Sequence, residues 1–378
     1  MDVEIVSDVR TFVDLQSEWN ALAECHATPL LRHEWFAAAF DAFGAGCDLA
    51  IHVVRDGGRM RAIAPFVIEH GLVSRLVLLG YQTFEPSGIL YADDNALQVV
   101  VHRLQAWHLP LFAPLLGLAE VRALACGALW RPETLQRLHS SASVPLGSNW
   151  PAFQAQMSKQ SRTYIRRKRK AAEREGAVRV DVVAPLEEEV ERHLAEFIRV
   201  EAAGWKSRKG TSLQRNARMR RFYTSYVKAA ARNAMLRMFF LRAGHHTMAG
   251  RMAVECGGRL WELKIGYDEE FSGCSPGILL THETLRWACV RGLIAHEFLG
   301  RAEPWQRWWP LELRQYQNVR LYPFSVAGCV ALGQDTGGIA ARRIAKPLQA
   351  GIRRVLRQHP ATRSASPSHH MLRLSDHT

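Results

Sequence analysis

The chain has 378 residues, of which 48% are hydrophobic and 22% charged, as in a soluble globular protein long enough for two domains. No run of about 18 apolar residues is present, which argues against a transmembrane helix, and the acidic N-terminus does not resemble a secretory signal. The net charge of +13 favours an anionic partner such as a nucleotide, a nucleic acid or a membrane surface. Seven cysteines without a CxxC pair predict reduced thiols and a cytoplasmic location, and we expect no metal site.

The first half begins with a predicted strand over Val3–Val6, and apolar residues at helical spacing then predict helices over Phe12–Ala23 and Leu31–Phe43. Three strands, one helix and a last strand follow in this order: Leu49–Arg55, Arg59–Ile68, Val73–Leu79, Ala96–Trp107 and Val121–Ala125. Asp56-Gly57-Gly58 predicts a hairpin turn between the first two strands. The segment Glu85–Gly88 is not a convincing phosphate loop, so we expect the first half to be structural or to bind the acceptor.

A segment rich in serine and proline, Ser140–Pro151, predicts the connection between two domains. The helix predicted after it, Met157–Gly176, carries many more basic than acidic residues. Three interpretations stay open: a helix that binds a polyanion, a solvated helix packed through residues such as Tyr164, or a helix beside the phosphates of a cofactor. Tyr164 is the only aromatic residue there, and base stacking needs several, so we do not expect nucleic acid to be the partner.

The second half continues with the same order of elements. Helices are predicted over Glu188–Gly204 and Asn216–Ala231, with the basic loop Trp205–Thr211 between them. Three strands follow: Met235–Leu241, Met248–Cys256 and Arg259–Tyr267. Because the order matches that of the first half, we predict a duplicated fold.

The small-residue loop Ser272–Gly277 follows the third of these strands. Ser275 and Pro276 predict a helix start, and a further strand is predicted over Leu293–Leu299. A strand, a glycine-containing loop and a helix N-terminus together present backbone N–H groups and the positive end of a helix dipole, which suits a phosphate. A tight connection that binds no ligand is the alternative.

The order strand, strand, strand, loop, helix, strand resembles the GNAT acyltransferase superfamily. Four phrases are similar to its CelD/BcsL branch, the acetyltransferases associated with bacterial cellulose and exopolysaccharide production and related to FemAB-like enzymes: Glu201–Thr211, Leu263–Phe271, Ser275–Gly277 and Phe298–Trp309. Related sequences usually carry aspartate and lysine where this chain has Ala302 and Gln306.

This resemblance implies acetyl-CoA or another acyl-CoA as co-substrate, held by the third strand and the loop after it. The residues implied to bind the cofactor are Ser272, Gly273, Ser275, Gly277 and Ile278. The residues implied to line the acceptor pocket are Trp205, Lys206, Tyr267, Glu303 and Trp309.

Acyl transfer to an amine needs a neutral amine, a polarised thioester and a proton for the departing thiolate. Alternation along Arg259–Asp268 places Glu262, Lys264 and Asp268 on one face of a strand, where buried charges are costly unless they are paired or functional. On the next strand His296 or Glu297 is a candidate base. We therefore name Glu262, Lys264, Asp268 and Glu297 as candidate catalytic residues, with a structural Glu262–Lys264 ion pair as the alternative.

We predict an α/β (α+β) fold of two tandem GNAT-like domains, each a mixed, mostly antiparallel sheet flanked by helices. The predicted divisions are residues 1–145, residues 146–335 with the acyl-CoA site, and residues 336–378, a basic amphipathic helix and a disordered tail. The expected activity is N-acyl transfer from acyl-CoA to a small-molecule or saccharide amine in exopolysaccharide or cell-envelope precursor metabolism. A FemAB-like transferase that uses aminoacyl-tRNA, a non-catalytic scaffold for a polysaccharide synthase, and peripheral contact with an anionic inner membrane stay open as alternatives.

Overall fold

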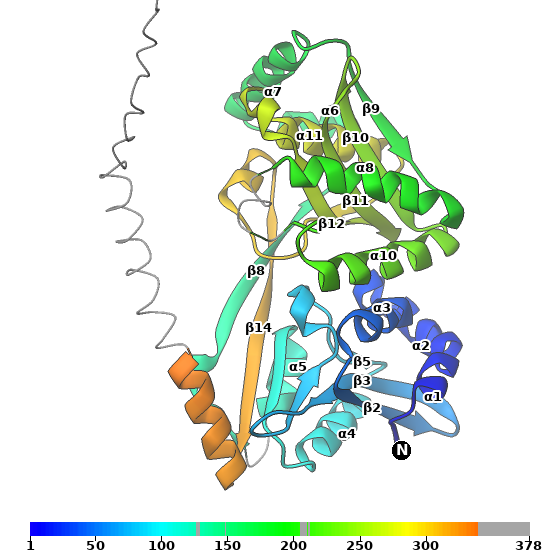
Figure 1. Cartoon of the computed structure of the whole chain (residues 1–378), viewed down its shortest axis with the longest axis vertical. Helices are drawn as coiled ribbons and strands as arrows, with labels where there is room; N and C mark the ends of the chain where they lie inside the picture. Colours follow the sequence, from blue (N-terminus) through cyan, green and yellow to red (C-terminus); the bar gives the residue numbers. More distant parts are fainter. Residues whose placement is uncertain (126–128, 148, 205–209, 211, 339–378) are drawn as a thin grey trace, which may run out of the picture. The chain divides into compact units, whose positions relative to one another are not determined.

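The structure is a computed structural model that describes residues 1–125, 129–147, 149–204, 210 and 212–338 (Figure 1). Contacts divide the chain into two compact units, Met1–Cys329 and Val330–Thr378. Only residues 330–338 of the second unit are described, and they are helical. The predicted basic amphipathic helix and tail therefore lie outside the described residues, apart from residues 336–338.

The first half of the larger unit contains a meander of antiparallel strands with helices before and after it. Its strands are β1 (Asp2–Val6), β2 (Cys47–Asp56), β3 (Arg59–Glu69), β4 (Arg75–Leu78), β5 (Leu90–Tyr91), β6 (Leu111–Leu116), β7 (Leu129–Trp130) and β8 (Arg137–Pro145). Its helices are α1 (Val9–Asp14), α2 (Gln16–Ala23), α3 (His33–Phe43), α4 (Asp94–Gln105) and α5 (Leu118–Ala125). The predicted hairpin of β2 and β3 with its glycine turn is confirmed, and so is the helix predicted over Ala96–Trp107, which is α4.

The strand predicted over Val121–Ala125 is wrong, because this segment belongs to helix α5. Val121 and Leu124 are buried and lie three residues apart, which is a helical spacing. The last strand of the first half's predicted order is instead β6, whose sequence LFAPLL contains Pro114. A register shift in the pairing of β6 with β14 accommodates this proline, which has no N–H to donate to the sheet.

The second half repeats the meander. Its strands are β9 (Val178–Val183), β10 (Leu236–Ala243), β11 (His246–Cys256), β12 (Arg259–Tyr267), β13 (Ala295–Glu297) and β14 (Glu312–Pro323). Its α-helices are α6 (Trp150–Gln156), α7 (Lys159–Ala172), α8 (Val190–Ala202), α10 (Ala217–Arg232) and α11 (Pro276–Val290), and short 3₁₀ segments form η6 (Glu269–Cys274) and η7 (Pro304–Trp308). The helices and strands predicted for this half are confirmed, with ends that differ by a few residues.

The two halves have the same sheet topology. In the first half β1, β2, β3 and β4 pair antiparallel in this order, and β4 then pairs parallel with β6. In the second half β9, β10, β11 and β12 pair antiparallel, and β12 pairs parallel with β13. A helix, α4 or α11, connects each parallel pair. The predicted fold class, two tandem GNAT-like mixed sheets flanked by helices, is therefore confirmed.

The halves exchange their last strands. β8, from the first half, pairs with β13 of the second, while β14, from the second half, pairs with β6 of the first. β8 and β14 also pair with each other, so the described strands form one continuous sheet (Figure 1). The prediction of a connection over Ser140–Pro151 is consequently wrong for residues 140–145, which lie within β8 in the middle of this sheet.

One apolar core joins the two halves on one face of the sheet. It contains Trp35 of α3 and Phe222 of α10, whose rings make an edge contact with centroids 4.9 Å apart. A second core lies between the sheet of the second half and α11, and a third between the sheet of the first half and α4. Helices thus cover both faces of the second half's sheet, α8 and α10 on one side and α11 on the other.

Candidate active site

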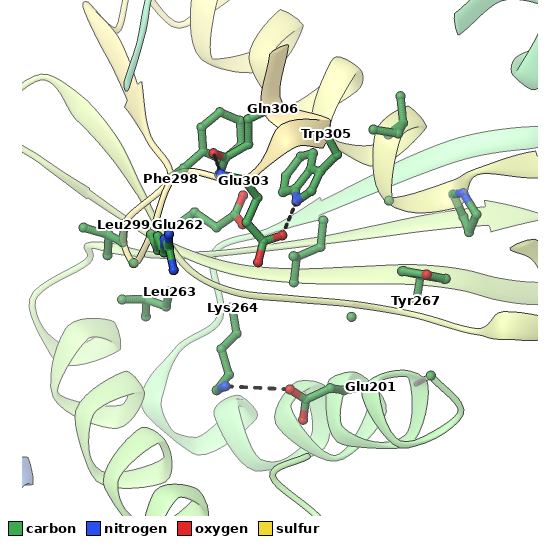
Figure 2. Close-up of a pocket in the computed structure, with 18 of the residues that line it drawn as sticks. Glu201, Glu262, Leu263, Lys264, Tyr267, Phe298, Leu299, Glu303, Trp305 and Gln306 are labelled. Atoms are coloured by element: carbon green, nitrogen blue, oxygen red, sulfur yellow. Dashed lines mark hydrogen bonds and ion pairs between the residues drawn. The ribbon is translucent and has the colours of Figure 1, made fainter. Parts of the chain in front are cut away.

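A cavity of about 580 Å³ lies where two parallel strands of the second half diverge. β12 and β13 pair from Arg259 opposite Ala295 to Trp261 opposite Glu297. Beyond this point residues 262–267 line one wall of the cavity, and residues that follow β13, from Phe298 to Gln306, line another (Figure 2). Its volume falls in the range of small-ligand sites.

A β-bulge interrupts β12 at this cavity. In its pairing with β11, Lys264 lies opposite Met252 and Glu262 opposite Ala253, so that Leu263 is an extra residue. Leu263 and Lys264 both face α8 and α10, whereas Glu262 faces α11. The prediction that Glu262 and Lys264 share one face, or pair with each other, is wrong because the bulge reverses the alternation between them.

Glu262 belongs to a buried charged cluster on the α11 side of β12. Its Oε2 lies 2.9 Å from Nη2 of Arg251, which is fully buried, and 3.4 Å from Nε2 of His296. The same Arg251 nitrogen donates to the hydroxyl of Thr281 on α11 at 2.5 Å. Burial lowers the pKa of His296, so this imidazole is neutral at pH 7. Arg251 is thus the ion-pair partner of Glu262 at the cavity wall.

Lys264 points to the opposite side, toward α8 (Figure 2). Its Nζ lies 3.8 Å from Oε1 of Glu201 and 5.0 Å from the centre of the Tyr223 ring. The other oxygen of Glu201 accepts the backbone N–H of Leu213 at 2.8 Å. Burial raises the pKa of Tyr223 well above 10, so that its hydroxyl stays protonated. Lys264 and Glu201 thus form a positioned ion pair beside the cavity.

The predicted phosphate loop lies at the start of α11 and beside the basic helix α7. Ser275 precedes the helix in a left-handed conformation, with φ of 51°, and its hydroxyl is 2.9 Å from the hydroxyl of Tyr164 on α7. Lys168, also on α7, donates to the carbonyl of Gly273 at 2.7 Å. Ile165 and Ala172 of α7 are buried in the core of the second half, as the packed-helix interpretation expects. A helix beside the phosphates of a cofactor stays a prediction that this position also allows.

Glu85, from the loop after β4 in the first half, reaches the cavity of the second half. Its Oε2 accepts the backbone N–H of Gly300 at 2.7 Å, across 215 residues of sequence. The residue as a whole is half-buried, whereas its carboxyl group is buried. Burial raises the pKa of this carboxyl group to about 8. We did not predict Glu85 as a site residue.

The raised pKa of Glu85 predicts how stability depends on pH. The folded protein binds this proton more tightly than the unfolded chain, whose glutamate has a pKa near 4.5, so stability falls as the pH rises from that value to about 8. We expect wild-type protein to lose stability relative to Glu85→Gln over this range, measured by urea unfolding at intervals of pH. Parallel pH curves for the two proteins would contradict this assignment.

The other predicted site residues divide into two groups. The cavity is lined by Tyr267, Ser272, Ser275, Gly277, Ile278 and Glu303, in addition to Glu262 and Lys264. Asp268, Gly273, Glu297 and Trp309 are not among the lining residues. Trp205 and Lys206 lie outside the described residues.

Local contacts explain why two of the candidate catalytic residues lie away from the cavity. Glu297 is buried between Arg259 and Arg314, with its Oε1 2.6 and 2.8 Å from their guanidinium nitrogens. Asp268 caps η6 by accepting the N–H of Glu270. These contacts suit structural roles, and a catalytic role for either residue stays a prediction.

Comparison with known proteins bears on the region that forms most of the cavity. Residues 159–307 match the acetyltransferase (GNAT) domain family. All cavity-lining residues except Thr83 and Glu85 lie within this GNAT region. The match supports acyltransferase chemistry at the cavity. No curated protein matches the chain, and the narrower likeness to CelD/BcsL-type enzymes stays a prediction.

Solved structures share the fold of both halves. FemX has a TM-score of 0.57 and 10% sequence identity, and the match covers 84% of this chain and 97% of FemX. The C-terminal domain of a putative lysylphosphatidylglycerol synthetase from Agrobacterium fabrum has a TM-score of 0.51 and 11% identity, covering 86% of this chain and 96% of that domain. L-PGS from Bacillus licheniformis has the same two values, with 83% and 91% covered. At these identities the likeness concerns the fold alone.

Two features are absent from the described residues. No helix there is long and apolar enough to cross a membrane. No three histidine, cysteine, aspartate or glutamate side chains of the described ranges gather as a group that could hold a metal ion.

Proposed function

We propose that this protein transfers an acyl group from an acyl-CoA to an amine acceptor at the cavity between β12 and β13. The amine nitrogen attacks the thioester carbonyl carbon, the carbon–sulfur bond breaks, and the thiolate takes up a proton. The observation that carries the proposal is the divergence of the two strands beyond Trp261 and Glu297, directly beside the loop before α11. The match of residues 159–307 to the GNAT family supports it.

The residues at the α11 end of the cavity fit an acyl-CoA donor. Ser272, Ser275 and Gly277 line the cavity at the helix N-terminus, which favours anions. The basic helix α7 packs against this loop through Tyr164 and Lys168. Next to the loop, Ile265 and Ile278 give the cavity apolar walls suited to a pantetheine arm. In this proposal the phosphates lie at the loop and the acyl group near Glu262.

The acceptor would then enter from the side of Glu85 and Glu303. Carboxylates at this end of the cavity suit a small-molecule or saccharide amine, and exopolysaccharide or cell-envelope precursor metabolism remains the proposed context. We propose a cytoplasmic location, with peripheral contact to an anionic inner membrane through the basic C-terminal segment as an untested addition. Nucleic acid is not the partner that we propose.

A transferase that uses aminoacyl-tRNA is the second candidate function. Its support is the shared fold with FemX over almost the whole of both chains, together with the basic helix α7 beside the cavity. A non-catalytic scaffold is the third, and the departures at Ala302 and Gln306 support it. The three functions differ in the ligand that should stabilise the folded protein.

Thermal unfolding with coenzyme A and with tRNA tests these alternatives. We expect coenzyme A to raise Tm by an amount that grows with its concentration, since it binds only the folded state. We expect tRNA to bind weakly and to lose its affinity between low and physiological salt, as nonspecific phosphate contacts do. Tight, salt-tolerant tRNA binding without a response to coenzyme A would favour the aminoacyl transferase, and no response to either ligand would favour the scaffold.

A further inference from the structure

Four glutamates line the cavity, and three of them have partners in the described residues that fix their carboxylates. Glu262 pairs with Arg251, Glu201 pairs with Lys264, and Glu303 accepts the indole N–H of Trp305 at 2.6 Å. The fourth, Glu85, forms no ion pair within the described part of the chain. Its Oε2 accepts the N–H of Gly300, and its Oε1 has no hydrogen-bond partner among the described residues. Glu85 is thus the carboxylate with the capacity to bind a new donor.

The backbone around Gly300 holds Glu85 in a defined position. Leu299 and Gly300, which follow β13, both have φ of 55°, and leucine rarely adopts this left-handed conformation. Both residues line the cavity. The hydrogen bond from Gly300 to Glu85 therefore joins a constrained segment of the second half to a carboxylate of the first half, and both residues line the cavity.

We propose that Glu85 is a catalytic base that the first half supplies to the second, and that the acceptor is a cationic amine bound through its ammonium group. This inference rests on the proposed acyl transfer. Oε1 of Glu85 accepts a proton from the ammonium nitrogen, whose freed lone pair then attacks the thioester carbonyl carbon. The carbon–sulfur bond breaks as the new carbon–nitrogen bond forms, and the second proton that the nitrogen loses passes to the departing thiolate. Glu85 returns its own proton to solvent after the amide leaves.

The surroundings of Glu85 suit this role. Burial raises the pKa of its carboxyl group to about 8 and the nearby Glu262 raises it further, while the N–H of Gly300 and the charge of Lys264 oppose the increase. A base with a pKa in this range accepts a proton from an alkyl ammonium group more readily than an ordinary exposed glutamate does. Activity should accordingly rise with pH through the pKa of this group.

The test compares Glu85→Gln, Glu85→Ala and the control Glu69→Gln. Glutamine in place of Glu85 keeps the volume and an oxygen that accepts the Gly300 N–H, but it cannot take a proton. Glu69, also in the first half and outside the lining residues, accepts the hydroxyl of Tyr81 at 2.8 Å, which glutamine can also do. The assay uses acetyl-CoA with spermidine and with glucosamine, and also follows hydrolysis of acetyl-CoA in the absence of amine.

We expect Glu85→Gln to lose at least about a hundredfold in kcat/KM for the amine and to lose the rise with pH. The affinity of Glu85→Gln for acetyl-CoA should equal that of wild type, and Glu69→Gln should have wild-type activity. Activity of Glu85→Gln near that of wild type, with loss only in Glu85→Ala, would overturn the inference and leave Glu85 as a positioning residue. If neither amine reacts, the same comparison applies to hydrolysis, where water gives its proton to Glu85.

The proposed function and this inference fail in different ways. Wild-type protein that does not bind acetyl-CoA would overturn both. Wild-type protein that binds acetyl-CoA but neither transfers nor hydrolyses the acetyl group would overturn the role of Glu85 and leave donor binding intact.

Discussion

Gly277→Glu is expected to abolish binding of coenzyme A while the protein remains folded. A Cβ at this position would lie 3.5 Å from Tyr267 and 3.9 Å from Ile265, which are ordinary contacts, so the substitution fits the second position of α11. The added carboxylate would lie in the cavity wall, where we place the pyrophosphate. We expect affinity to fall by at least about a hundredfold, or about 2.7 kcal/mol, in calorimetry.

Two control variants separate the effect of the added charge from the effects of the added volume and of the site of substitution. Gly277→Gln adds nearly the same volume without the charge and should lose less affinity than Gly277→Glu. Gly147→Glu makes the same substitution at an exposed glycine where an added Cβ would meet no atom within 4 Å, and it should leave affinity unchanged. Equal affinity in wild type and a folded Gly277→Glu would contradict the assignment of the loop.

Arg251 and Glu262 are expected to depend strongly on each other for the stability of the fold. Arg251 is fully buried and Glu262 nearly so, so removing either partner leaves the other charge without compensation. Arg251→Met and Glu262→Gln should each lower the free energy of unfolding by about 3–5 kcal/mol. The double variant should cost less than the sum of the two, with a coupling energy of at least about 2 kcal/mol in urea unfolding. Additive costs would show that the pair does not act as a unit.

This coupling changes how the catalytic role of Glu262 must be tested. A loss of turnover in Glu262→Gln alone would have two causes that cannot be separated: the missing carboxylate and the buried arginine left without its partner. Glu297→Gln does not leave a fully buried arginine without a partner. The two arginines beside Glu297 keep 26% and 41% of their side-chain surface exposed and can be solvated. Turnover should therefore be measured in the Arg251→Met/Glu262→Gln double variant and compared with Arg251→Met.

The sequence was sufficient for the parts of the site that depend on local patterns. Alternation located β12, and the small residues before Pro276 located the loop and the start of α11. The bulge at Leu263 could not be predicted, because an alternating segment with one extra residue looks the same until the strand beside it is known. It nevertheless decides which side of the sheet Lys264 faces.

The contribution of the first half to the cavity could not be predicted either. Glu85 meets Gly300 across 215 residues, and no spacing or motif links the two. The serine-rich sequence of β8 resembled a connection because its burial comes from neighbouring strands rather than from its own apolar residues. Even with β8 predicted as a strand, its pairing with β13 could not be predicted, because that pairing depends on the exchange of last strands between the two halves.

The exchange of β8 and β14 has a consequence for the order in which the protein folds during synthesis. β6 contacts β14 through residues as far apart as Leu115 and Asn318, 203 positions later in the chain. The first half therefore leaves the ribosome long before the strand that covers the edge of β6 exists, and this edge, Leu111–Leu116, is apolar. β8 likewise has neither of its neighbouring strands until β13 and β14 have been synthesised. The sheet closes only when residues up to 323 have emerged, and until then the nascent chain carries an open strand edge.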